Sequence, residues 1–160
     1  MASQARDAAI VGIHEYPSRK VDGKVSAMQI KADCAARALA DAGLTWKDVD
    51  AVYDAGEGGG MMSGLTIAEY FGLKPNVIDT TAVGGSSYEF HAAHARRDIA
   101  RGKARVALLT YGSTAASRGM AIGIGGRGGF ATHPAENMDV FAGMTLVSNY
   151  AMVARRHMHQ

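Results

Sequence analysis

The stretch that decides the fold is PNVIDTTAVGGSSYEF, at residues 75–90. A short β-rich run at residues 77–81 leads through Ala82 and Val83 into two glycines, and then into two serines at the predicted start of a helix. A turn of this kind directs unpaired backbone N–H groups and the positive end of the helix dipole at one place. That place suits a thioester oxygen, a phosphate or a nucleophilic side chain. Ala82 stands where a nucleophile would gain most, and it has no reactive atom.

Strand and helix patterns alternate along the first two thirds of the sequence. Short apolar or β-rich runs predict strands at residues 8–13, 49–54, 77–81 and 105–111. Helical spacing predicts helices at residues 27–42, 66–71 and about 86–101. Ser26 is placed to cap the first of these helices. The alternating order favours an α/β fold with a mainly parallel, right-handed sheet, which we expect to occupy residues 1–112.

The character of the sequence changes after Gly112. Residues 113–137 are rich in glycine and show no strand or helix pattern. A loop of that length inside a compact domain is either functional or a sign that something is missing. Residues 141–160 regain helical spacing, but no residue after Gln160 stops that helix. We therefore expect the sequence to be part of a longer protein.

Composition narrows the class of protein. The 160 residues are 48% hydrophobic and 20% charged, which is typical of a soluble globular protein. A formal net charge of +2, without a run of Lys or Arg, argues against nucleic-acid binding. No apolar run is long enough for a membrane span and residues 1–13 lack a signal-peptide pattern, so we expect a cytoplasmic protein. Cys34 is the only cysteine, which excludes a disulfide framework, and its helical position predicts a small core residue.

Several other residues are of types that can act in catalysis or binding, but their sequence context favours a structural role or no functional role. Ser86 and Ser87 are interpreted as helix-capping residues, because no neighbouring histidine base can be assigned to them. His91 and His94 have the i, i+3 spacing of a ligand pair but lack a third ligand, so no metal site is predicted. The GIGGRG motif at residues 123–128 matches a dinucleotide fingerprint in letters only, since no strand precedes it and no helix follows it.

Four phrases occur in the order and spacing of a known family. They are AGLTWKDVD at residues 42–50, AVGGS at 82–86, VALLTYGS at 106–113 and the closing pattern at 150–159. Together they resemble the thiolase superfamily, and especially its sterol-carrier-protein-x and lipid-transfer-protein-like branch. The resemblance implies a thiolase-like three-layer α/β/α fold with a mainly parallel sheet, of which this chain covers the first half. Residues 113–160 would then be part of an inserted loop domain.

In catalytic thiolases the third strand ends in a cysteine, followed by two residues and then Gly-Ser. Here Ala82 matches that cysteine, and Val83, Gly84, Gly85 and Ser86 follow it. The resemblance implies that these five residues line the active site. Because alanine cannot carry an acyl group, covalent thiolase chemistry is disfavoured. The family's histidine and second-cysteine motifs are absent from this sequence, so no catalytic residue can be assigned in this half.

One reaction type survives the loss of the cysteine. Retro-aldol cleavage of a β-hydroxyacyl-CoA needs a base and hydrogen-bond donors for the enolate oxygen, but no covalent intermediate. The lipid-transfer-protein-like branch includes cysteine-less aldolases that shorten steroid side chains together with a small OB-fold partner. The resemblance therefore implies a carbon–carbon lyase. Two alternatives stay open: a non-catalytic subunit that binds acyl-CoA or lipid, and an acetyl-CoA acyltransferase whose nucleophile is not recognised.

The same resemblance implies partners. Coenzyme A enters as part of the substrate, and no covalently bound cofactor is expected. Arg127, in the glycine-rich loop, is a candidate contact for a CoA phosphate. Thiolase-like proteins dimerise through the third strand, so we expect a homodimer in which that strand pairs across a two-fold axis. The residues of that strand are Val77, Ile78, Asp79, Thr80 and Thr81. An OB-fold protein is the expected further partner.

Overall fold

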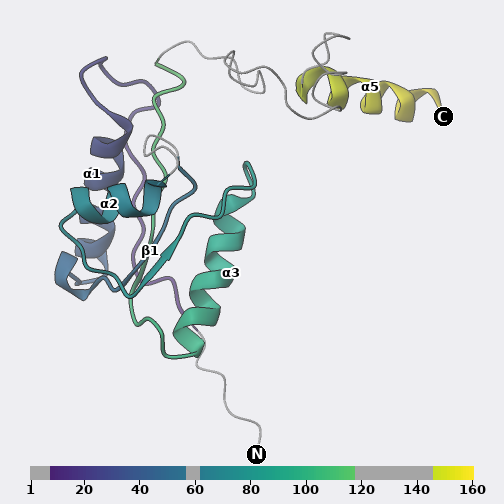
Figure 1. Cartoon of the computed structure of the whole chain (residues 1–160). Helices are drawn as coiled ribbons and strands as arrows, with labels where there is room; N and C mark the ends of the chain where they lie inside the picture. Colours follow the sequence, from purple (N-terminus) through teal and green to yellow (C-terminus); the bar gives the residue numbers. More distant parts are fainter. Residues whose placement is uncertain (1–7, 57–61, 118–145) are drawn as a thin grey trace, which may run out of the picture. The chain divides into compact units, whose positions relative to one another are not determined.

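The computed structural model describes residues 8–56, 62–117 and 146–160. The chain divides into two compact units, residues 1–117 and residues 118–160. The first unit holds the sheet and its helices, and the second contributes helix α5, Leu146–His159 (Figure 1). Helix α5 confirms the helical spacing predicted near the end of the sequence. The assignment of residues 113–160 to an inserted domain stays a prediction.

The sheet has three parallel strands in the order β2-β1-β3. Strand β1 (Ala51–Tyr53) lies between β2 (Val77–Asp79) and β3 (Ala107–Leu109), and all three of its residues are buried. Ala51 is paired with Val77 on one side and with Ala107 on the other. Each strand falls within a range predicted from the sequence, and the parallel α/β arrangement is confirmed. Strand β2 lies at an edge of the sheet.

Helices cover both faces of this sheet. Alternate residues of β1 point to opposite faces, so Val52 packs in a cluster that includes Leu39 of helix α1 (Ala27–Asp41) and Ile67 of helix α2 (Ser63–Tyr70). The short 3-10 helix at Trp46–Asp48 contributes Trp46 to the same cluster. Helix α3 (Ser87–Ala100) covers the other face (Figure 1). Tyr53 packs there in a cluster that includes Ala95 of α3. The result is the three-layer α/β/α arrangement that the family resemblance implied.

Local signals at the ends of α1 behave as the sequence predicted. The Ser26 hydroxyl oxygen accepts the N–H of Gln29, and the Gln29 side chain accepts the N–H of Ser26, which together form a capping box. Gly43 follows the helix with φ of 67°, a conformation that favours glycine. These two signals mark the beginning and the end of α1.

The strand predicted at residues 8–13 is wrong. These residues belong to no strand, and Ile10, Val11 and Ile13 are 86%, 62% and 73% exposed. A strand needs a neighbour to satisfy its backbone, and none of the described residues pairs with this segment in a sheet. Its Ile13 N–H instead donates to the side chain of Asp41, and Gly12 packs against the backbone of α1.

Among the residues that the structure describes, none of the helices has both the length and the apolar character that a membrane span requires.

Candidate functional site

The turn at residues 82–86 lies just beyond the carboxyl end of β2, where parallel α/β sheets commonly bind their ligands. Its five residues, predicted from the sequence as a site lining, are all exposed. Those residues are Ala82, Val83, Gly84, Gly85 and Ser86. Gly84 has φ of 78°, which a residue with a side chain would adopt only under strain. Helix α3 begins directly afterwards, and two N–H groups of its first turn, those of Ser87 and Phe90, donate to the carbonyls of Gly84 and Ser86 over 3.1 and 3.3 Å.

Two neighbouring serines have different roles at this turn. Ser86 is the N-cap residue by position, but its side chain makes no capping hydrogen bond, so the capping role predicted for it is wrong. Ser87 is the first helical residue and is buried. Its hydroxyl oxygen accepts the Val83 N–H over 2.9 Å, and the hydroxyl donates to the Gly84 carbonyl over 2.6 Å. Ser87 is therefore the serine that fixes the turn.

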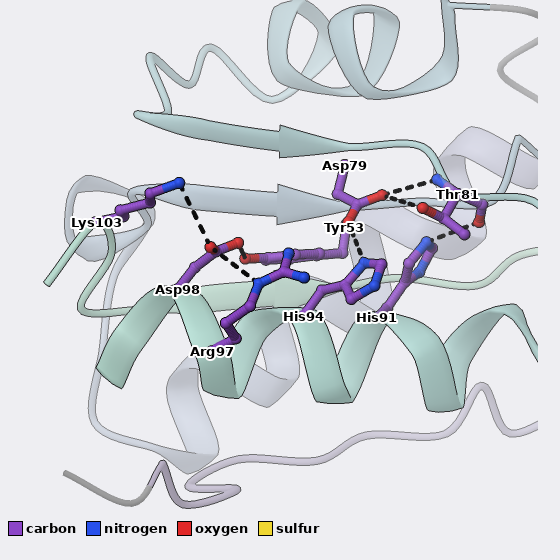
Figure 2. Close-up of polar contacts among 8 residues, drawn as sticks. All are labelled: Tyr53, Asp79, Thr81, His91, His94, Arg97, Asp98 and Lys103. Atoms are coloured by element: carbon purple, nitrogen blue, oxygen red, sulfur yellow. Dashed lines mark hydrogen bonds and ion pairs between the residues drawn. The ribbon is translucent and has the colours of Figure 1, made fainter. Parts of the chain in front are cut away.

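His91 lies one helical turn further along α3 and is completely buried. Its Nε2 is 2.9 Å from the carbonyl oxygen of Thr81, the residue just before Ala82 (Figure 2). Because a carbonyl only accepts, the hydrogen-bond network assigns the proton to Nε2. The other ring nitrogen, Nδ1, is buried without a hydrogen-bond partner among the described residues. The rings of Tyr53 and Tyr88 lie 6.0 and 5.5 Å away between centroids.

Asp79, the last residue of β2, binds both Thr81 and helix α3. One carboxylate oxygen accepts the N–H and the hydroxyl of Thr81 over 2.8 and 2.7 Å, and the other lies 2.6 Å from Nδ1 of His94 (Figure 2). Burial alone raises the pKa of Asp79, but the hydrogen bonds from Thr81 and His94 outweigh it and hold that pKa below its usual range. Asp79 is therefore an anion that anchors the backbone leading into the turn.

A second polar pair joins the central strand to α3 on the same face of the sheet. The Tyr53 hydroxyl donates to Asp98 over 3.0 Å, and both residues are buried (Figure 2). Arg97 and Lys103 lie 3.7 and 4.0 Å from the other carboxylate oxygen of Asp98. Burial, followed by the hydrogen bond to Asp98, raises the pKa of Tyr53 well above its ordinary value. Tyr53 is thus a neutral structural donor at neutral pH.

A buried ion pair lies at the carboxyl end of β1. Lys31 Nζ is 2.5 Å from Asp54 Oδ2, and neither side chain is exposed. The same carboxylate accepts the Gly56 N–H over 2.8 Å and the Thr110 hydroxyl over 3.2 Å. Asp54 therefore connects α1 with the segments that follow β1 and β3. Sequence reasoning missed this cluster, although a lysine on the inner face of an amphipathic helix is a usable signal for a buried acidic partner.

The structure does not bring the remaining candidate functional residues from the sequence together into one site. His91 and His94 bind different groups, and the described part of the chain holds no cluster of three or more His, Cys, Asp or Glu residues suited to a metal ion. Cys34 is half-buried beside the packed face of α1 rather than on it, and burial, with Asp33 second, raises the pKa of its thiol. Arg127 lies outside the described residues.

Comparisons with known proteins bear on the fold. No protein-family model matches the chain, and no curated protein matches it. A solved structure described as "Ltp2-ChsH2(DUF35) aldolase" aligns with a TM-score of 0.72 and 24% sequence identity, over 96% of this chain and 38% of that one. The fold, a small parallel three-stranded sheet flanked by helices, is consistent with a thiolase-like half-fold. The chain spans well under half the length of its structural neighbour, and at this identity the similarity shows the fold alone.

Proposed function

We propose that the intact protein is a carbon–carbon lyase that cleaves a β-hydroxyacyl-CoA by a retro-aldol reaction. The proposal rests on one observation: position 82, in the exposed strand-to-helix turn, holds an alanine and so offers no nucleophilic atom. The fold similarity to a protein described as an aldolase supports the same reaction class. A lyase and an acyltransferase differ most at this residue, because only the acyltransferase needs a covalent acyl intermediate.

The proposed reaction uses the turn as a donor of hydrogen bonds. A base removes the β-hydroxyl proton, a carbonyl forms at that carbon, and the bond between the α and β carbons breaks. The released electron pair becomes the enolate of the shorter acyl-CoA thioester, which then takes up a proton at its α carbon. The proposal assigns the developing charge of the enolate oxygen to backbone N–H groups of the turn, those of Gly84 and Gly85, since the Val83 and Ser87 N–H groups donate to the Ser87 hydroxyl oxygen and the Gly84 carbonyl. The base is a residue that we do not assign within this chain.

Partners form part of the proposal. Strand β2 is an edge strand and Ile78 on it is 37% exposed, which supports a homodimer joined through residues 77–81. The description of the structural neighbour names Ltp2 and ChsH2(DUF35) together, and for this protein we propose an OB-fold partner. Arg127 is proposed to contact a CoA phosphate. An Ile78→Lys variant should elute as a monomer in size-exclusion chromatography, while the unaltered protein elutes as a dimer.

The direct test uses the intact protein together with its partner. β-Hydroxyacyl-CoA thioesters that differ in the group beyond the β carbon, steroid side chains included, are incubated with the complex. Release of an aldehyde or ketone and of the shortened acyl-CoA is followed by mass spectrometry. The matched control is the same thioester without the β-hydroxyl, which must remain intact. Absence of cleavage over the whole series would contradict the lyase and leave acyl-CoA binding and acyl transfer as the alternatives.

Acyl-enzyme trapping separates the lyase from an acyltransferase. Labelled acetyl-CoA should leave no covalent label on the unaltered protein, because Ala82 has no nucleophilic atom. An Ala82→Cys variant should take up the label at residue 82, since a thiol near a helix N-terminus has a lowered pKa. Peptide mapping that finds the label on another residue of the unaltered protein would favour the acyltransferase.

A further inference from the structure

We propose that Ser87 and His91 are positioning residues that hold the turn in the conformation in which its N–H groups receive the thioester oxygen. The inference rests on the proposed function, because it assigns the thioester to that turn. Neither side chain is accessible to a substrate, since Ser87 is 1% and His91 0% exposed. They act through the backbone on either side of Ala82.

The two side chains bracket Ala82 along the chain. They are spaced i, i+4 on helix α3 and therefore lie on the same face of it. His91 donates to the carbonyl of Thr81, which fixes the peptide unit that enters Ala82. Ser87 accepts the N–H of Val83, which fixes the peptide unit that leaves Ala82. The orientation of the turn is thus set from the helix and does not depend on the side chain at position 82.

The orphaned nitrogen of His91 supports a role beyond packing. A buried polar atom without a partner destabilises a fold, and in a native structure such an atom calls for an explanation. An apolar residue of similar size would remove the unpaired Nδ1, but it would also release the Thr81 carbonyl. The N–H and hydroxyl of the same threonine both donate to Asp79, whose other oxygen contacts His94, whereas the Thr81 carbonyl is held by His91.

Loss of either contact should act on the transition state more than on substrate binding. Oxyanion donors stabilise developing charge because they are held in place in advance, and removal of one donor in a known enzyme lowers kcat about 10²–10³-fold. A turn that is misoriented rather than deleted should lose less. We expect a fall in kcat of about 10- to 100-fold, with KM changed by less than about threefold, because the two buried side chains do not touch the substrate.

The test compares variants in the intact complex. Ser87→Ala and His91→Asn should show the kcat loss, whereas His91→Gln should recover most of it, because a glutamine amide reaches the position of Nε2 and an asparagine amide does not. Ser117→Ala is the matched control, since Ser117 also accepts a backbone N–H over 2.9 Å but at Val21, away from the turn. A rise in KM at unchanged kcat, or equal loss in the two His91 variants, would overturn the proposal.

Two NMR measurements keep the proposal testable if a variant fails to fold or the unaltered protein cleaves nothing. The ¹⁵N shifts of the His91 ring should show the proton on Nε2, and a proton on Nδ1 would overturn the assignment of the Thr81 contact. Added acetyl-CoA should shift the amide signals of Gly84 and Gly85 in the unaltered protein. Binding with these shifts but without cleavage would contradict the lyase alone, whereas binding without them would overturn the positioning role.

Discussion

The buried pair Lys31–Asp54 makes the sharpest prediction about stability. Replacing Lys31 with methionine keeps the length of the side chain but leaves the Asp54 carboxylate buried without its counter-ion. Breaking a buried pair in this way costs about 3–5 kcal/mol. Asp54 retains two donors, the Gly56 amide and the Thr110 hydroxyl, so we expect the lower end of that range, about 3 kcal/mol.

A double-mutant cycle separates the charge from the packing. Asp54→Asn alone should also cost about 3 kcal/mol, because it leaves the Lys31 ammonium without a carboxylate. In the double variant Lys31→Met with Asp54→Asn no buried charge remains, and the asparagine can still accept from Gly56. Its loss should therefore be smaller than the sum of the two single losses by at least about 2 kcal/mol.

Urea unfolding of the intact protein, followed by far-UV circular dichroism, measures these free energies. Lys47→Met is the matched control: Lys47 is exposed, and its replacement should change the free energy of unfolding by less than about 0.5 kcal/mol. A loss below about 1 kcal/mol for Lys31→Met would be the value of an exposed pair and would refute the buried pairing.

Three further predictions follow from other contacts. Tyr53→Phe leaves a buried oxygen of Asp98 without its donor and should lower the free energy of unfolding by about 1–3 kcal/mol, and spectrophotometric titration should show one tyrosine fewer among those that ionise last. The lowered pKa of Asp79 means that its carboxylate stabilises the fold above the unfolded-state pKa of about 4 and that this contribution disappears as pH falls through the lower folded-state pKa. Asp79→Asn should therefore destabilise the protein at pH 7 in urea titrations and make little difference at the acid end; a constant difference across pH would contradict the assignment. Gly112→Ala would place Cβ 2.6 Å from a backbone oxygen of α1 and should lower the melting temperature, whereas Gly23→Ala, with open space around it, should not.

Local sequence patterns predicted many of the helices and strands correctly. Capping at Ser26, the glycine after α1 and the short β-rich runs act over a few residues, and the structure places helices and strands accordingly. The turn at residues 82–86 was found for the same reason, since a strand, two glycines and a helix start follow one another directly. The strand predicted at residues 8–13 is wrong because a strand forms only where a neighbouring strand pairs with it. The pattern of these six residues does not show whether such a strand is present.

The inner faces of the helices were harder to predict. The sequence predicted Cys34 as a small core residue of α1, but the structure leaves it half-buried and buries Lys31 on that helix, and it buries His91 on α3. Apolar periodicity assigns a polar residue to the outside by default. These two are inside because each meets a polar partner, Asp54 or the Thr81 carbonyl, that another segment of the chain delivers.

The sequence by itself determined the chemistry available at the turn, because a residue type settles whether a nucleophilic atom exists, and Ala82 supplies none. It also determined that a helix would start beside that residue. Only the tertiary structure decided which side chains hold the turn: Ser87 rather than Ser86 from the helix itself, and His91 and Asp79 from either side of Thr81. The physical reason is that a hydrogen bond needs an angle and a distance of a few ångströms, and those depend on how α3 packs against β1 and β2.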